Sequence, residues 1–302
     1  MQSFFDHALT GSYAGVMLLL GLSLSIRDVL DIFRYPKGVL VGLLSQMFLL
    51  PGLAFVMVSL IPMPDHLKIG FILLSACPGG STSNLASYML RGNVALSVSL
   101  TTVNSFLVIF SVPTILTLSA SLIEFDGGAP QLPFWDTVLK IIMLTLVPCL
   151  AGMLFRAQWT ETARRLERIF KWVMPALMAL AIFGVAFLGE KKGPSVGMDD
   201  YLQALPAALA LNVISMVLGY VLALMVGLDL KDRFTIGIEV GIQNAALAIT
   251  IASLPGFMNN PQFAVPAIVY LLFPFFTALV FGYLANRKEM GRISIQMFKP
   301  KN

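Results

Sequence analysis

The stretch Cys77-Pro78-Gly79-Gly80-Ser81-Thr82-Ser83-Asn84 interrupts an apolar segment that is long enough to cross a lipid bilayer. A second interruption, Glu239-Val240-Gly241-Ile242-Gln243-Asn244, falls at the corresponding place in the other half of the chain. Unwound backbone at membrane depth is tolerated only where it is buried in protein or lines a cavity. Paired interruptions in two halves are typical of transporters and indicate the binding site. The sequence therefore predicts a membrane transporter whose interrupted segments contact its cargo.

The composition around these interruptions is that of a polytopic all-α membrane protein. Of the 302 residues, 57% are hydrophobic and only 12% are charged, whereas a soluble domain carries about 25% charged residues. The net charge of +4 does not indicate a nucleic-acid partner, because the basic residues lie in short loops between apolar segments. Cys77 and Cys149 lie within apolar segments and do not suggest a disulfide framework.

The apolar segments predict nine transmembrane spans, since about 20 residues are needed to cross the hydrocarbon core. The first half, residues 1–159, holds the spans at about 8–26, 36–60, 67–91 (broken), 93–120 and 134–155. The second half, residues 160–302, begins with an amphipathic linker and holds the spans at about 170–189, 201–227, 231–254 (broken) and 262–286. The prolines inside these spans suggest kinks.

The order of the spans predicts an inverted repeat. The last four spans repeat the first four in type: plain, plain, broken, plain. The broken spans open alike, with Leu67-Lys68-Ile69-Gly70-Phe71 in one and Leu230-Lys231-Asp232-Arg233-Phe234 in the other. One of them enters from outside and the other from inside, so the two repeats have opposite orientations.

Lysine and arginine define the predicted orientation. With the N-terminus outside, 16 of the 20 basic residues fall in cytoplasmic loops, and only Lys68, Lys191 and Lys192 fall in outer loops. Lys140 lies within a span, one turn after Asp136, which predicts a local ion pair. This distribution follows the positive-inside rule. We expect an integral protein of a bacterial inner membrane, with its N-terminus outside and its C-terminus in the cytoplasm.

Glu239 is the one acidic residue that the sequence places at membrane depth. A charge there costs roughly 2.5–3.5 kcal/mol or more, so such residues are functional candidates. A bound cation can serve as its partner, although a protonated or structurally hydrogen-bonded glutamate remains an alternative. No histidine or cysteine cluster accompanies it, which argues against zinc or copper. The nearby side chains are oxygen donors, which hard cations prefer: Ser81, Thr82, Ser83, Asn84, Gln243 and Asn244.

The span at 93–120 adds a second set of polar residues. Ser97 and Thr101 are four residues apart and therefore lie on one helix face. They are either ligands of the same cation or hydrogen-bonding residues between helices, and the sequence leaves both readings open. Thr102, Asn104 and Ser105 are open to the same helix-packing interpretation.

These residues resemble the bile acid:sodium symporter family. The similarity rests on the two interruptions, on Arg91-Gly92-Asn93-Val94-Ala95-Leu96-Ser97 and on Thr101. It implies a core domain, in which two broken helices cross at their unwound points, and a panel domain against which the core moves. Bacterial members often have ten helices, whereas the nine spans expected here are the number found in animal members.

The resemblance implies two sodium sites and a substrate site at the crossing. The first sodium site would use Ser83, Asn84, Ser97, Thr101 and Glu239. The second would use Gln46, Glu239, Gln243 and the main-chain carbonyls of Val240 and Ile242. The substrate, an organic anion such as a bile acid or a smaller carboxylate, would lie near Ser81, Thr82 and Asn244. The resemblance leaves the individual anion and the oligomeric state open.

The leading prediction is sodium-coupled symport of an organic anion by alternating access, and the protein is not expected to be an enzyme. A proton-coupled transporter with Glu239 as its proton site is the alternative closest in mechanism. An intramembrane hydrolase would need a base beside a serine nucleophile, and neither histidine nor lysine is placed to act as one. A channel or a receptor would not require paired broken helices.

Overall fold

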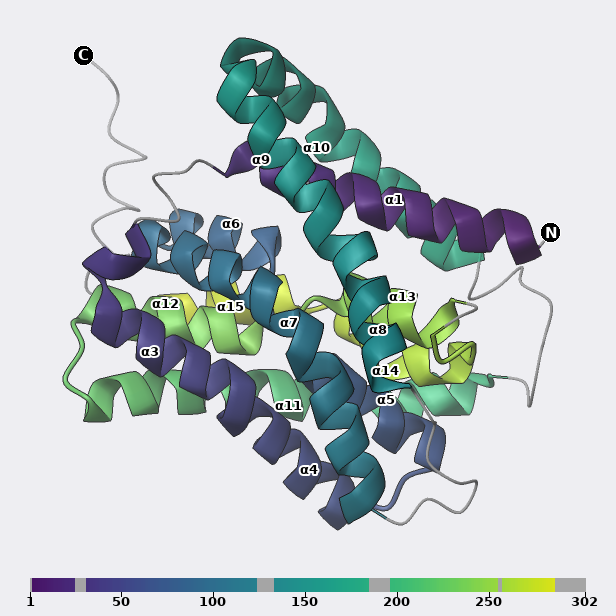
Figure 1. Ribbon diagram of the computed structural model, residues 1–302. Coiled ribbons are helices and arrows are strands. Elements are labelled where there is room, and N and C mark those ends of the chain that lie inside the picture. Colours follow the sequence, from purple (N-terminus) through teal and green to yellow (C-terminus); the bar gives the residue numbers. More distant parts are fainter. Residues whose placement is uncertain (1, 25–30, 124–132, 185–195, 255–256, 286–302) are drawn as a thin grey trace, which may run out of the picture.

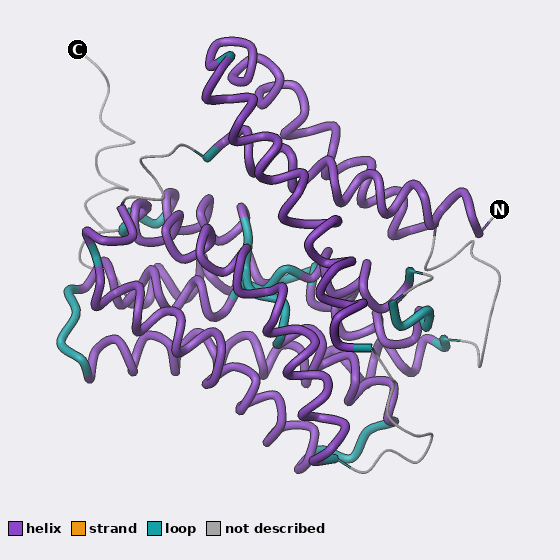
Figure 2. The backbone as a smooth tube through the Cα atoms, viewed as in Figure 1, coloured by secondary structure: helices purple, strands orange, loops and turns teal. Residues whose placement is uncertain are grey.

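The computed structural model describes residues 2–24, 31–123, 133–184, 196–254 and 257–285, and within these ranges all regular structure is helical (Figures 1 and 2). The first half contains α1 Gln2–Ser23, η1 Asp31–Arg34, α3 Pro36–Leu44, η2 Ser45–Leu49, α4 Leu50–Leu60, α5 Asp65–Ser75, α6 Ser81–Met89, α7 Val94–Leu122, α8 Phe134–Ile141, η3 Ile142–Leu146 and α9 Val147–Gln158. The second half contains α10 Thr160–Phe183, α11 Met198–Met225, α12 Leu230–Gly241, α13 Ala245–Ser253, η5 Pro261–Ala264, α14 Val265–Tyr270 and α15 Pro274–Ala285.

Six stretches of the described chain are long and apolar enough to cross a membrane. They are Pro36–Leu60, Val94–Leu122, Phe134–Gln158, Met198–Met225, Leu230–Ser253 and Pro261–Ala285, and each coincides with a predicted span. The three remaining predicted spans do not coincide with a long, apolar helix in the described chain. α1 has only a shorter apolar stretch, His7–Ser23. The predicted broken span 67–91 consists of two short helices, and α10 carries charged residues in its first half.

Two predicted boundaries differ from the structure. The amphipathic segment at 160–171 does not form a separate helix, because α10 continues from it to Phe183. The last span, expected to be plain, is interrupted at residues 271–273, between α14 and α15. Pro274 begins α15, and its missing N–H group explains why the helix restarts there.

Two of the predicted proline kinks are π-helical turns. Pro51 and Pro148 each follow a five-residue π turn, Ser45–Leu49 and Ile142–Leu146 respectively. A proline removes one hydrogen bond from the preceding helical turn, and the wider turn accommodates that loss. Both π turns contain polar side chains, Gln46 in one and Thr145 in the other, and both side chains face the molecular interior.

Three helices, α1, α9 and α10, form a group that lies above the other helices in Figure 1. Glycines permit the close approach of α1 to α9. A Cβ atom on Gly21 would lie 2.0 Å from the carbonyl oxygen of Cys149, and one on Gly152 would lie 2.3 Å from that of Leu18. Close backbone contact at small residues is the usual mode of helix association in membranes.

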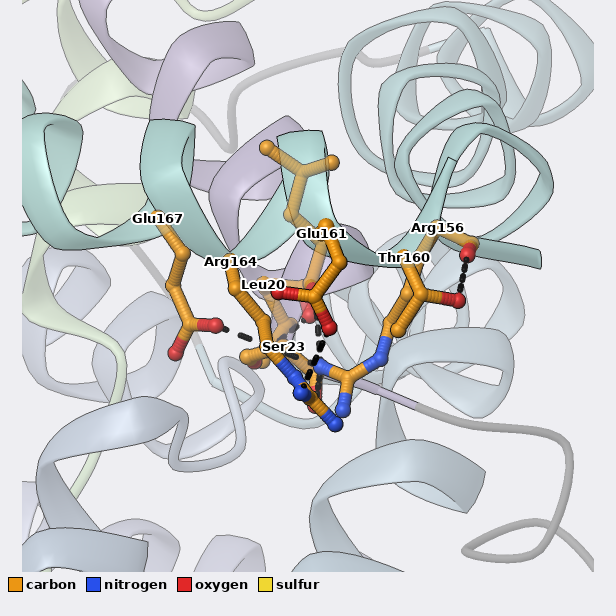
Figure 3. A network of polar contacts seen from close by, with 8 residues as sticks. Leu20, Ser23, Arg156, Thr160, Glu161, Arg164 and Glu167 are labelled. Carbon is orange, nitrogen blue, oxygen red and sulfur yellow. Dashed lines mark hydrogen bonds and ion pairs between the residues drawn. The ribbon is translucent and has the colours of Figure 1, made fainter. Parts of the chain in front are cut away.

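Arg156 joins the same three helices at one end (Figure 3). Its guanidinium group donates hydrogen bonds to the carbonyl oxygens of Leu22 and Ser23, at 2.7 and 2.8 Å, and so satisfies the end of α1. It also lies 4.0 Å from the Glu167 carboxylate on α10. A cation at a helix C-terminus is favourable for the helix dipole. Arg156 thus connects α9, α1 and α10.

The remaining helices surround the second broken span. In Leu230–Ser253 89% of the residues are buried, whereas the other five candidate spans are 33–44% buried. Helices α3, α5, α6, α7 and α11 pack around α12 and α13. The interior of this second group is therefore where Glu239 and the polar residues near it lie.

The predicted orientation in the membrane depends on lysine and arginine residues, and the structure describes only some of them. Arg27, Lys191, Lys192, Arg287, Lys288, Arg292, Lys299 and Lys301 lie outside the described residues. The predicted Asp136–Lys140 ion pair forms on α8. Lys68 pairs with Asp65 at the start of α5, and His66 lies 3.0 Å from Asp200 at the start of α11, so these two helix ends are neighbours.

Candidate functional site

The two broken helices cross at their interruptions. The backbone N–H of Asn244 donates a hydrogen bond to the carbonyl of Cys77 at 3.0 Å, which joins the two unwound segments directly. Gly79 lies so close to the other segment that a Cβ atom would be 2.3 Å from the Ile242 carbonyl oxygen. Only glycine allows this approach. The prediction that Gly79 belongs to an unwound contact is therefore consistent with the packing.

The interruptions are shorter than the sequence suggested. In the first, α5 ends at Ser75 and α6 begins at Ser81, so Ser81 to Asn84 are helical. In the second, Glu239 and Val240 are still part of α12, which ends at Gly241, and α13 begins at Ala245. Polar residues also occur in the first and last turns of helices, so the polar stretches in the sequence are longer than the unwound segments.

Two helix N-termini lie beside the crossing. α13 begins after Asn244, whose side-chain oxygen accepts from the Leu247 N–H at 3.0 Å, and α6 begins after Gly80. Helix N-termini carry a partial positive charge and free N–H groups, and so favour an anion. The Asn244 side chain also lies near Gly80, which brings both N-termini to one place.

Five of the predicted site residues form one cluster of oxygen atoms, which we term the glutamate cluster: Ser83, Asn84, Ser97, Thr101 and Glu239. The Ser97 hydroxyl donates to Oε1 of Glu239 and lies 2.8 Å from Oδ1 of Asn84. The Thr101 hydroxyl donates to the same Asn84 oxygen at 3.1 Å. The Ser83 hydroxyl, which donates to the Gly80 carbonyl at 2.7 Å, also interacts with the Glu239 carboxylate. Helices α6, α7 and α12 thus contribute to a single buried cluster.

A second group, the glutamine cluster, consists of Gln46, Gln243 and the Val240 carbonyl. Gln46 Nε2 donates to Oε1 of Gln243 at 2.7 Å, although the two residues are 197 positions apart in the chain. Gln243 Nε2 donates in turn to the Val240 carbonyl at 2.7 Å. The π turn at Ser45–Leu49 carries Gln46 into this position. Gln46, which the family resemblance assigned to the second sodium site, thus contacts the second interruption.

Two oxygen atoms of these clusters are buried without a hydrogen-bond partner among the described residues: Oε2 of Glu239 and Oε1 of Gln46. Glu239 and Gln46 are each 2% exposed. A buried acceptor without a donor is costly, especially a carboxylate oxygen. A hard cation bound by carboxylate, hydroxyl and amide oxygens would satisfy both atoms. The donor set therefore fits an alkali metal ion.

A narrow, partly open pocket lies between the two helix groups. Its twelve lining residues, none of them charged, are Tyr13, Met17, Leu20, Pro78, Gly79, Gly80, Asn104, Ser105, Val108, Thr145, Asn244 and Leu247. Of the predicted substrate residues, Asn244 lines this pocket, whereas Thr82 is exposed and does not. The side chain of Ser81 lies outside the described part of the structure.

The sequence did not assign four polar residues of this pocket to the substrate site: Tyr13, Asn104, Ser105 and Thr145. Tyr13 of α1 lies 3.4 Å from the amide nitrogen of Asn244. Asn104 was left open to a helix-packing interpretation, and its Oδ1 atom has no hydrogen-bond partner among the described residues. Thr145 interacts with the Tyr13 hydroxyl. The signal available for Asn104 was an amide in an apolar span one turn beyond Thr101. Tyr13 and Thr145 carried no comparable signal.

A polar contact one turn from the glutamate cluster was missed as well. Asn93 caps α7 through its side-chain oxygen and donates from Nδ2 to Asp232 at 2.7 Å. Its backbone N–H donates to the Thr235 hydroxyl at 2.8 Å. Asn93 lies four residues before Ser97 on one helix, and Thr235 lies four residues before Glu239 on the other. The Asn93–Thr235 contact therefore repeats the Ser97–Glu239 contact one helical turn away. Asp232, 8% exposed, is a second buried acid on α12.

Comparison with known proteins gives one family. The model of the sodium bile acid symporter family matches residues 14–192. The chain is 30% identical over 256 residues to a probable sodium/metabolite cotransporter of the Arabidopsis thaliana chloroplast, covering 84% of this chain and 60% of that protein. It is 27% identical over 259 residues to an uncharacterized sodium-dependent transporter of Bacillus subtilis, covering 84% of this chain and 75% of that one.

A mammalian protein shows the same similarity. The hepatic sodium/bile acid cotransporter of Rattus norvegicus is 24% identical over 262 residues, covering 85% of this chain and 70% of that protein. The chain spans about 60% of the length of the plant relatives it matches. The matched family is one of symporters, not of enzymes. With more than half of its residues matched by the family model, the chain belongs to the sodium bile acid symporter family.

Proposed function

We propose that this protein is a secondary active transporter that couples the inward movement of sodium to uptake of an organic anion. The observation that carries the proposal is the buried carboxylate of Glu239 at the crossing, with serine, threonine and asparagine oxygens around it. Its Oε2 atom has no hydrogen-bond partner in the part of the chain that the structure describes. Family membership supports sodium as the coupling ion. A proton carrier would not need such a shell of oxygen donors.

Two sodium ions bind in this proposal. The first lies in the glutamate cluster, held by Ser83, Asn84, Ser97, Thr101 and Glu239. The second lies between Glu239 and the glutamine cluster, held by Gln46, Gln243 and the carbonyls of Val240 and Ile242. The two oxygen atoms without partners, one in each cluster, support this division. Since Glu239 is shared, its charge offsets part of the repulsion between the two cations.

The organic anion binds in the pocket beside the crossing. The N-termini of α6 and α13 and the two bound cations supply the positive field, because no lining residue is charged. Asn244 is the predicted substrate residue whose placement supports this site, and Ser81 and Thr82 remain predictions. Two relatives, a probable sodium/metabolite cotransporter and a sodium/bile acid cotransporter, support small organic solutes as cargo.

Transport proceeds by alternating access between the two helix groups. The group α1, α9 and α10 is held together by glycine contacts and by Arg156, which supports its role as a panel that moves as one unit. The crossing helices and their neighbours form the core. Nine spans, the inverted repeat of residues 1–159 and 160–302, and an outside N-terminus with a cytoplasmic C-terminus complete the proposal. The bacterial inner membrane remains a prediction.

Uptake into liposomes containing the purified protein tests this function. A panel of radiolabelled carboxylates and bile acids is offered with an inward sodium gradient, with choline in place of sodium, and with a pH gradient alone. We expect at least one anion to accumulate only with sodium, and faster when the interior is negative. Accumulation driven equally well by the pH gradient in choline would contradict sodium coupling.

A further inference from the structure

A chain of buried hydrogen bonds ends on the carbonyl of Gly241, the last residue of α12. Asn212 of α11 donates from Nδ2 to this oxygen at 2.6 Å, and the Tyr270 hydroxyl of α14 donates to it as well. Asn212 Nδ2 also lies 3.1 Å from the Tyr270 oxygen, and Thr277 of α15 donates to Asn212 Oδ1 at 2.5 Å. Asn212 and Tyr270 are 0% and 1% exposed. Two helices, α11 and α14, therefore donate to one carbonyl at the second interruption, and α15 supports the Asn212 donor.

The orientation of the Asn212 amide follows from its partners. The Gly241 carbonyl can only accept, so the amide nitrogen must face it. A flipped amide would place two carbonyl oxygens 2.6 Å apart. Thr277 favours the observed orientation by donating to the amide oxygen, but its single proton is shared with the Pro274 carbonyl of its own helix at 2.9 Å. Among the described residues, the Tyr270 hydroxyl donates to the Gly241 carbonyl alone.

These contacts determine which way the carbonyls at the end of α12 point. The Ile238 carbonyl still accepts from the Ile242 N–H at 2.9 Å, whereas the carbonyls after it lack helical donors. Ile242 is extended, with φ −106° and ψ 114°, and successive carbonyls of an extended chain point to opposite sides. Held toward α11, the Gly241 carbonyl leaves the next carbonyl, that of Ile242, facing the crossing, where its oxygen lies beside Gly79.

We propose that Asn212, Tyr270 and Thr277 are positioning residues that set the affinity of the transporter for sodium. They contact no part of either predicted sodium site. Instead, they fix the peptide of Gly241, so that the Ile242 carbonyl, which the second proposed sodium site uses, faces the crossing. The inference rests on the proposed function, because the direction of this carbonyl matters in this way only if a cation binds to it.

Removing the Tyr270 hydroxyl tests the inference with the least disturbance. In Tyr270→Phe the Gly241 carbonyl keeps only the Asn212 donor, and its peptide gains freedom to rotate. A hydrogen bond contributes about 0.5–1.5 kcal/mol; we expect the half-saturating sodium concentration to rise roughly threefold to tenfold. Thr277→Val is expected to give a smaller rise, because Asn212 keeps its other partners, and Thr277→Ser is expected to restore the wild-type value.

The readout is the melting temperature of the purified full-length protein against sodium concentration, since a ligand bound only to the folded state stabilises it. Tyr220→Phe is the matched control, because Tyr220 is on α11, the helix that carries Asn212, and its ring packs on Phe281. We expect the control to keep the wild-type sodium half-point. Variants that melt lower without sodium but keep that half-point would show a merely structural network and overturn the inference. A wild-type protein that shows no response to sodium would overturn the proposed function and this inference with it.

Discussion

Glu239→Gln is the substitution with the largest expected effect on sodium binding. The carboxylate is 2% exposed, accepts from Ser97 through one oxygen and has no partner at the other. A unit charge and a cation about 4 Å apart interact by about 4 kcal/mol at an effective dielectric constant of 20. Since 1.4 kcal/mol is a factor of ten, losing this attraction weakens sodium binding by about three orders of magnitude.

The stability of the same variant is expected to change in the opposite direction. Without sodium, the buried carboxylate has no cation to offset its desolvation, and burying an uncompensated charge costs several kcal/mol. Glutamine keeps the size and part of the hydrogen bonding, so Glu239→Gln is expected to melt at the same temperature as the sodium-free wild type or higher. Adding sodium should then raise the melting temperature of the wild type but not that of the variant.

The assay compares melting curves across sodium concentrations at constant ionic strength, with choline as the replacement cation, together with sodium-driven uptake in liposomes. Glu161→Gln is the matched control, because that side chain is 77% exposed on α10 and pairs only locally with Arg164. The control should keep the wild-type sodium response. A Glu239→Gln protein that takes up the anion with a normal sodium dependence would refute the reasoning.

Three further substitutions test other parts of the account. Asn84→Ala leaves two hydroxyls without their shared acceptor, and we expect a roughly fivefold to tenfold higher sodium half-point in the same melting assay. Gly79→Ala places a methyl group 2.3 Å from the Ile242 carbonyl, so size-exclusion chromatography should show little monodisperse protein; a normal yield would mean that the crossing is looser than described. Arg156→Ala uncaps α1 and should lower the stability by about 1 kcal/mol while leaving the sodium half-point unchanged, and a shifted half-point would contradict a purely structural role.

The sequence predicted the parts of the fold that depend on hydropathy and on chain breaks. Six predicted spans correspond to helices because their apolar stretches are long and bounded by polar loops. The first interruption followed from its proline and glycines, which cannot continue a helix without cost, whereas the crossing was implied only by the family resemblance. Ser97 and Thr101 were predicted to share a face, and the structure places both beside Asn84.

Other features depend on contacts that no local pattern encodes. The interruption at 271–273 was missed because hydropathy does not change across it and prolines are common in membrane helices. The link between Gln46 and Gln243 joins residues 197 positions apart, and only the family resemblance indicated it. Asn212, Tyr270 and Thr277 were missed because each is unremarkable in its own helix. Their role arises from a network in which Asn212 and Tyr270 donate to the Gly241 carbonyl and Thr277 donates to Asn212.

Direct binding of radioactive sodium to the purified protein tests the central claim, that the crossing of the broken helices holds the coupling ions. Scintillation proximity with wild type and Glu239→Gln measures this without a transported solute. The account predicts saturable, sigmoid binding that approaches two ions per chain in the wild type and no saturable binding in the variant. Equal binding by the two proteins, or none by the wild type, would contradict it.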